Sequence, residues 1–423
     1  MSGFIQKLTL LLQDPQLRNR LFFVVGALFV FRLLATIPIP GIDAAQLQLF
    51  FSNNQFFGLL NLFSGGGLSN LSLVMLGVGP YITASIVMQL LTLMIPRLKQ
   101  LYQEEGEVGR AKFNMYSRLL TLPIAVVQGI SFLVILERSG VLPSLGLFPF
   151  VANLVTIVAG SMLLMWIGEL ISEYGLGNGV SLLIFAGIVA QLPSVVSQTL
   201  FSFESSQVPI YLAFIAATLV VIAAVVFVTE AERPVPVTYA KRVRGMKFFG
   251  GASTYLPLRL NQAGVIPIIF ALSFLLIPQM FASFFQTSSI AALASTSTWI
   301  LGVMQNLPLY GALYFILVFF FTYFYTMVTF DPHMIAENLQ KNGAFVPGVR
   351  PGPSTEAHLG NVITRITFVG AFFLGTIAVL PIAVQSLTHI QSLALGGTAL
   401  LIVVSVILDL VRRIDAQISI REY

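Results

Sequence analysis

Few side chains in this sequence are of the types that do chemistry, and none is spaced to do it. The three histidines, His333, His358 and His389, lie far apart, and cysteine is absent, so disulfides and thiolate metal ligands are excluded. No pair of histidines has the spacing of a zinc site, and no glycine-rich loop is of the phosphate-binding type. We therefore predict no enzyme activity, no metal and no cofactor.

Ionisable residues inside the apolar runs are also scarce, which bears on whether the chain is a transporter. Arg32 lies within a run, whereas Glu169, Glu173, Asp331 and Asp409 fall toward the ends of theirs. A coupled transporter usually carries ionisable groups near the middle of the membrane. The sequence has no such series of carboxylates for a proton relay. A passive channel is favoured, and an ion-coupled secondary transporter of small solutes remains the alternative.

Aliphatic side chains recur at helical spacing in three of the runs. Residues three or four apart share one face of a helix, and this relation joins Val78 with Ile82, Ile184 with Ile188, and Ile266 with Ile269. A constriction of such side chains can close a pore by excluding water. Ordinary packing or lipid contact would give the same pattern, so spacing alone leaves both interpretations open.

The composition indicates an integral membrane protein that is all-α. Of its residues, 57% are hydrophobic and 9% are charged, and the mean hydropathy is +0.90. A soluble domain carries roughly 25% charged residues, and a helix needs about 20 apolar residues to cross a bilayer. Ten runs predict ten transmembrane helices, near 21–37, 71–95, 119–136, 151–171, 180–200, 208–229, 263–285, 309–330, 366–388 and 393–411.

The basic residues orient these spans, because Lys and Arg concentrate in cytoplasmic loops. With both termini in the cytoplasm, every Lys and Arg falls on the cytoplasmic side except two. Arg32 lies inside a span, and Arg138 lies on the outer side of the membrane. We therefore expect a multi-pass protein whose two ends are cytoplasmic.

Ten spans divide into two halves of five, 1–207 and 208–423, and an odd number per half makes the halves inverted. Gly79-Pro80 in the second span and Ile266-Pro267 in the seventh interrupt helices at matching positions. Interruptions of this kind mark functional sites between repeats, although membrane helices tolerate Gly and Pro in any case. The long loops 230–262 and 331–365 are rich in Arg, Lys, Gly and Pro, which suits either docking of a partner or orientation alone.

Motifs along nearly the whole chain resemble the SecY family, the channel subunits of bacterial Sec protein translocases. In order, the matching strings are LFSGGGL (62–68), GPYITASI (79–86), EYGLGNG (173–179), LIFAGI (183–188), YAKR (239–242), AGVIP (263–267), FDP (330–332), VPGVRPG (346–352) and GGTALLIVV (396–404).

This resemblance implies an hourglass pore between the two halves, with a lateral gate toward lipid between the second and seventh spans. It also implies a function: translocating unfolded secretory polypeptides across the membrane and releasing membrane-protein segments sideways into it. By motif position, the pore ring is Val78, Ile82, Ile184, Ile188, Ile266, Ile269 and Ile402.

Two further sets of residues follow from the same resemblance. A short plug helix, which closes the outer funnel of the resting channel, falls on Asn61, Leu62, Phe63, Ser64, Gly65, Gly66, Gly67, Leu68, Ser69 and Asn70. Polar members of the lateral gate are expected at Thr83, Gln89, Gln128 and Ser273.

The family also implies partners. The two long loops dock the ribosome or the motor ATPase SecA, here through Lys241, Arg242, Arg244, Lys247 and Arg350. SecE and SecG are the expected accessory subunits, and the other expected ligands are signal-bearing nascent or precursor polypeptides and membrane lipids. The expected location is the bacterial cytoplasmic (inner) membrane.

Overall fold

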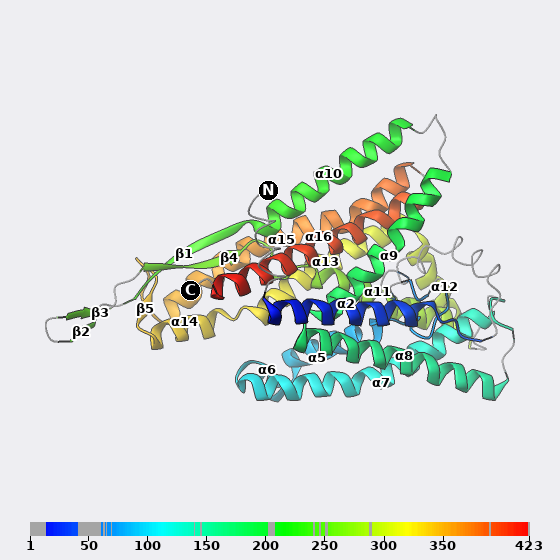
Figure 1. Cartoon of the computed structure of the whole chain (residues 1–423), viewed down its shortest axis with the longest axis horizontal. Helices are drawn as coiled ribbons and strands as arrows, with labels where there is room; N and C mark the ends of the chain where they lie inside the picture. Colours follow the sequence, from blue (N-terminus) through cyan, green and yellow to red (C-terminus); the bar gives the residue numbers. More distant parts are fainter. Residues whose placement is uncertain are drawn as a thin grey trace.

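The structure is a bundle of long helices with a small sheet at one end (Figure 1). It is a computed structural model, and it describes residues 14–40, 61, 64, 66–68, 70–138, 140–143, 146–201, 208–239, 242–244, 247–249, 253–286, 290–388 and 391–421.

Each predicted span overlaps a helix. In chain order these are α2 (Pro15–Thr36), α5 (Gly79–Met94), α7 (Gly106–Arg138), α8 (Leu147–Tyr174), α9 (Gly179–Phe201), α10 (Val208–Glu230), α11 (Ile266–Phe285), α13 (Leu307–Thr329), α15 (Pro353–Thr388) and α16 (Gln391–Arg421). Within the described residues, six helices are individually long and apolar enough to cross a membrane. The pair of α5 and α6 (Pro96–Gln103), bent by 116°, is apolar and long enough together to be a broken seventh span or a re-entrant loop. The chain is therefore a multi-pass membrane protein.

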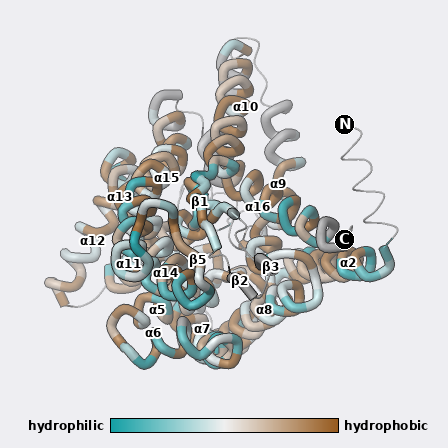
Figure 2. The backbone as a smooth tube through the Cα atoms, turned by 90° about the vertical axis from the view of Figure 1, so that its left-hand side faces the viewer, coloured by the Kyte–Doolittle hydropathy of each residue, from teal (hydrophilic) through white to brown (hydrophobic). Residues whose placement is uncertain are grey.

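The helices contact one another in two sets. The first set is α2, α5, α7, α8 and α9, and the second is α10, α11, α13, α15 and α16. Between the sets, α11 lies against α5 and α7, and α16 lies against α9. This grouping agrees with two five-helix halves. The predicted boundary between residues 207 and 208 lies at the end of a segment, 202–207, that is outside the described residues. Figure 2 looks along the bundle and shows α5 and α11 on the same side of it, in agreement with their contact.

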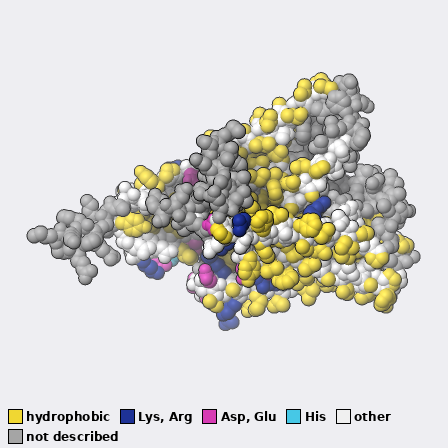
Figure 3. Space-filling model, in the orientation of Figure 1, with side chains coloured by type: hydrophobic (Ala, Val, Ile, Leu, Met, Phe, Trp, Pro, Cys, Tyr) yellow, Lys and Arg dark blue, Asp and Glu magenta, His cyan; other side chains and the backbone are white. Residues whose placement is uncertain are grey.

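Charged side chains gather at one end of the bundle, which we call the basic end (Figure 3). There β1 (Glu232–Tyr239) pairs antiparallel with β4 (Ser253–Arg259) and with β5 (Ala344–Phe345). A separate hairpin of β2 (Arg242–Arg244) and β3 (Lys247–Phe249) lies at the far tip (Figure 1).

Much of the two long loops predicted between spans has regular structure. The first segment contains the strands β1 to β4, and the second contains β5 and α14 (Pro332–Lys341). The helix α15 begins at Pro353, well before the predicted span at 366. A helix of 15 residues, α12 (Ala291–Gln305), was also not predicted.

The second predicted span is not helical along its whole length. Residues 73–78 form turns, and α5 begins only at Gly79, with proline in its first turn. Gly77 has φ of +61°, a left-handed conformation that glycine adopts without steric cost. The hydroxyl of Ser161 donates to the carbonyl oxygen of Gly77 at 2.8 Å, so α8 satisfies a backbone group that the interrupted helix leaves without a partner.

Small residues set how closely the elements of the first set approach. A Cβ built on Gly160 of α8 would overlap the carbonyl oxygen of Leu73, and one on Gly179 would overlap that of Gly168. Lipid tails are as apolar as protein interiors, so membrane helices associate through close packing at small residues. Gly160 therefore fixes the irregular 70–78 segment against α8.

We expect Gly160→Ala to destabilise the protein by on the order of 1–3 kcal/mol, because the added methyl must displace backbone. Gly26→Ala is the matched control, since a Cβ there would meet nothing within 4 Å. Thermal unfolding of the purified protein in detergent measures both. Equal melting temperatures for the two variants would contradict the close contact.

Candidate pore and gate

Six of the seven predicted ring residues are buried in the main hydrophobic core, which also contains residues of α2, α8, α13 and α15. Their exposed fractions are 2% for Val78, 6% for Ile82, 1% for Ile184, 2% for Ile188, 5% for Ile269 and 2% for Ile402. The seventh, Ile266, is partly buried and packs against the same core. Together they join the beginnings of α5 and α11 to α9 and α16, so both sets of helices contribute.

The interrupted helices explain why these aliphatic residues meet. Val78 is the N-cap of α5 and Val265 is the N-cap of α11, and both helices have proline in the first turn. Proline suits that position because its missing N–H would have no partner within the helix and its fixed φ is helical. The chain therefore enters both helices from inside the bundle and presents its apolar residues there.

The structure describes six of the ten predicted plug residues. Asn61 is helical, and Ser64, Gly66, Gly67, Leu68 and Asn70 are in turns, whereas Leu62, Phe63, Gly65 and Ser69 lie outside the described residues. The hydroxyl of Ser64 donates to the carbonyl of Asn61 at 3.1 Å and accepts from the backbone N–H of Leu68 at 2.9 Å. The described part is thus locally hydrogen-bonded and largely buried.

An apolar cluster encloses the end of this segment. Leu68 and Leu71 are fully buried and pack with the residues Phe132, Leu133 and Leu136 of α7. Leu276 of α11 packs against the same cluster. The end of the candidate plug therefore lies in a cluster to which α7, α8 and, at its edge, α11 contribute.

Two polar side chains from the first set also approach the candidate plug. The amide of Gln191 on α9 donates to the carbonyl of Asn61 at 3.4 Å. A Cβ built on Gly66 would lie 3.4 Å from Nε2 of Gln191 and 3.6 Å from Nη1 of Arg32. The arginine within the first span is thus directed at the segment, which accounts for a charge in an apolar helix.

The predicted gate residues lie on the helices that meet at the seam between the sets. Thr83 and Gln89 are on α5, Gln128 is on α7, and Ser273 is on α11. Thr83 and Ser273 are buried, and Thr83 donates to the carbonyl of Gly79 at 3.0 Å. The side-chain oxygen of Gln89 is buried without a hydrogen-bond partner in the described part of the chain.

The predicted docking residues fall at the basic end. Arg350 is exposed in the turn between β5 and α15, where the hydroxyl of Thr355 donates to its carbonyl at 2.8 Å. Arg242, Arg244 and Lys247 are in β2 and β3, and Lys241 lies outside the described residues. On α14, Lys341 donates to the Glu337 carboxylate at 2.7 Å and thereby lowers its pKa.

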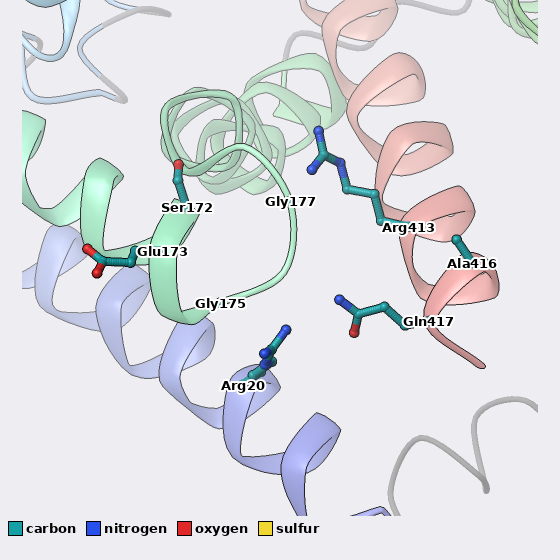
Figure 4. A pocket seen from close by; sticks show the side chains of 8 residues that line it. All are labelled: Arg20, Ser172, Glu173, Gly175, Gly177, Arg413, Ala416 and Gln417. Atoms are coloured by element: carbon teal, nitrogen blue, oxygen red, sulfur yellow. The ribbon is translucent and has the colours of Figure 1, made fainter. Parts of the chain in front are cut away.

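A pocket at the basic end was not predicted as a site. It has a volume of about 310 Å³ and lies among the start of α2, the α8–α9 turn and the end of α16. Arg20, Arg413 and Gln417 extend into it, whereas Glu173 points away (Figure 4). In the sequence Arg20 and Arg413 serve only as positive charges that orient the spans. Nothing in their spacing indicates that they line the same pocket.

Comparison with known proteins decides the family. The family model described as SecY matches residues 72–411, which include the second span, both interrupted helices and all of the ring. The chain belongs to the SecY family. The resemblance of its motifs to that family is confirmed.

Curated relatives match this SecY-family chain from end to end. The protein translocase subunit SecY of Streptomyces scabiei is 41% identical, and the alignment covers 97% of each chain. The subunit of the same name from Mycobacterium bovis is 40% identical, over 100% of this chain and 99% of that one.

Solved structures share the fold. One described as a protein-conducting channel has a TM-score of 0.64 at 19% identity, covering 94% of this chain and 91% of the other. Another, Sec61 in the canine ribosome–channel complex, has a TM-score of 0.60 at 18% identity, with the same coverage of each chain. The predicted fold class, an all-α integral membrane protein, is confirmed.

We expect Gly66→Ala to displace the candidate plug, because φ of +82° strains any residue with a Cβ by about 1–2 kcal/mol. The substitution Ser64→Cys at this buried position reports the displacement, since the chain has no other cysteine. Labelling of the introduced thiol by a membrane-impermeant reagent should accelerate in the Gly66→Ala background.

Gly140→Ala is the matched control for this experiment. Gly140 has a similar φ of +74°, but a Cβ there would meet nothing within 4 Å. It should leave the labelling of the cysteine at position 64 unchanged. Unchanged labelling in Gly66→Ala would show that Gly66 does not hold the segment in place.

Proposed function

We propose that this chain is the protein-conducting channel of a Sec translocase, and that it translocates unfolded secretory polypeptides and releases membrane segments into the bilayer. One observation carries the proposal. In a chain of the SecY family, residues of α5, α9, α11 and α16 bring Val78, Ile82, Ile184, Ile188, Ile269 and Ile402 into one buried cluster. These six residues, with Ile266 packed against the same core, are the pore ring of this proposal.

The ring accounts for a resting channel that does not leak. Water is expelled from a narrow aliphatic constriction, so ions meet a barrier without any charged gate. Above it, the plug of residues 61–70 covers the outer funnel. A moving polypeptide takes the place of the plug, and the flexible side chains of the ring close around it.

The seam between α5, α7 and α11 is the lateral gate. An apolar signal segment that enters this seam binds the open state more favourably than the closed one. Its binding therefore shifts the equilibrium between the closed and open gate toward the open state. Thr83, Gln89, Gln128 and Ser273 set how readily the seam opens. The buried Gln89 oxygen, which has no hydrogen-bond partner among the described residues, makes the closed seam less stable than a fully satisfied one.

Partners supply the energy, because the chain has no nucleotide-binding motif of its own. The ribosome or the motor ATPase SecA docks on the basic end through Lys241, Arg242, Arg244, Lys247 and Arg350. SecE clamps the two sets of helices, and SecG is the second accessory subunit. The basic end faces the cytoplasm, with both termini, in a bacterial inner membrane.

The ring is tested by Ile402→Asn in vesicles reconstituted with the channel, its partner subunits and SecA. Asn holds water in the constriction, so resting ion leak should rise, and translocation of a precursor with a weakened signal should rise by about tenfold, the ratio for a shift of about 1.4 kcal/mol. Protease protection of the precursor measures transport.

Ile407→Asn is the control, because Ile407 is on the same helix but is 43% exposed and outside the buried cluster. It should leave leak and selectivity as in the unaltered channel. If Ile402→Asn behaves in the same way, Ile402 is not part of the ring. If the unaltered channel protects no precursor, the proposed function is wrong.

Docking is tested by Arg350→Glu, which should abolish SecA-driven transport while the protein stays folded and inserted. Reversing the charge replaces an attraction to an acidic partner with a repulsion. Arg233→Glu on β1 is the control, since Arg233 is also exposed at the basic end. Normal transport by Arg350→Glu would remove Arg350 from the docking surface.

A further inference from the structure

Arg138 is the single basic residue that the ten-span topology places on the outer side of the membrane, opposite the cytoplasm. It belongs neither to the proposed pore nor to the proposed docking surface. It is the last residue of α7, which belongs to the first set of helices. Its Nη1 donates to the carbonyl oxygen of Phe284 at 3.2 Å. Phe284 is in α11, so the bond crosses directly from one set to the other.

The acceptor is at a helix end that needs a donor. The last four carbonyls of a helix have no partner from their own helix, and Phe284 is the second-to-last residue of α11. The guanidinium of Arg138 therefore caps α11 from a neighbouring helix. A planar group with five N–H donors is suited to such a bridge.

Helix direction makes the bridge electrostatically favourable. The bond joins the last residue of α7 to the second-to-last residue of α11, so the C-terminal ends of the two helices meet. Each such end carries the equivalent of about half a negative charge. Two ends of the same sign repel each other, and a cation between them turns this repulsion into an attraction.

The bridge lies where the plug is held. Leu133 and Leu136 of α7 pack in the cluster that buries Leu68 and Leu71, and Leu276 of α11 packs against it. Holding the ends of α7 and α11 together therefore also keeps those leucines enclosed.

We propose that Arg138 is a positioning residue that holds the lateral gate closed at its outer end, and so sets how apolar a signal segment must be to open it. The inference rests on the proposed channel function. The guanidinium stabilises only the closed arrangement, because the carbonyl of Phe284 moves away with α11 when the gate opens. Losing it should raise the open population whatever partner drives transport.

The test measures the width of the gate directly. Spin labels on cysteines that replace Val127 of α7 and Phe281 of α11, both exposed, report the distance between the two helices in the resting channel with its partner subunits. In Arg138→Gln the fraction of molecules with the longer distance should rise by about tenfold, since the charge-assisted bond between the two helices is lost. Arg138→Lys keeps the positive charge but lacks the planar guanidinium, and it should raise the same fraction by about threefold.

Arg110→Gln is the matched control, because it removes the same charge from the other end of α7, where Arg110 is exposed. It should leave the distances unchanged. In parallel, Arg138→Gln should increase translocation of a precursor with a weakened signal several-fold, while a precursor with an intact signal is transported as before.

The outcomes separate the two proposals. A distance distribution in Arg138→Gln equal to that of the unaltered channel would overturn the role of Arg138, even if transport is normal. If Arg138→Gln does not fold, an unchanged distribution in Arg138→Lys would overturn it instead. If the unaltered channel transports no precursor, the channel function fails, and the distances still report whether Arg138 holds α7 and α11 together.

Discussion

A backbone amide or carbonyl without a partner inside a bilayer costs several kcal/mol, and the rest of this structure depends on how the non-helical residues 70–78 meet that constraint. The N–H of Ile39 donates to Leu71 and that of Leu73 donates to Ile37, so the segment pairs with the end of α2. The hydroxyl of Ser161 covers the carbonyl of Gly77 from α8. Because these bonds fix the segment, α5 can begin in the interior of the bundle.

The beginning of α5 in the interior has consequences in two directions along the chain. Toward the C-terminus, it places Val78 and Ile82 against residues of α9, α11 and α16. Toward the N-terminus, the same segment leads to Leu68 and Gly66, which α7, α9 and α2 surround. The ring, the plug and the gate helices are thus parts of one connected arrangement, and movement of α11 disturbs all three.

Much of this arrangement could be predicted from the sequence, because its determinants are local. Apolar runs predict the helices, and loop charges predict their direction. The folded basic end was missed, because proline cannot donate a hydrogen bond to a neighbouring strand, and Pro234, Pro236 and Pro257 lie in β1 and β4. The early start of α7 was missed because its first turns are polar and exposed. The bond from Arg138 to Phe284 depends on two helices far apart in the chain, and no local pattern encodes it.

The central claim is that a polypeptide passes through the aliphatic ring, and a cross-link tests it most directly. The variant Ile82→Cys would be oxidised together with a precursor that carries one cysteine and is arrested halfway across the membrane. Leu93→Cys is the control, because Leu93 is on the same helix and 64% exposed. We predict a disulfide to the precursor from position 82 and none from position 93. No disulfide from position 82 or from any other ring position, with an engaged precursor, would contradict the account.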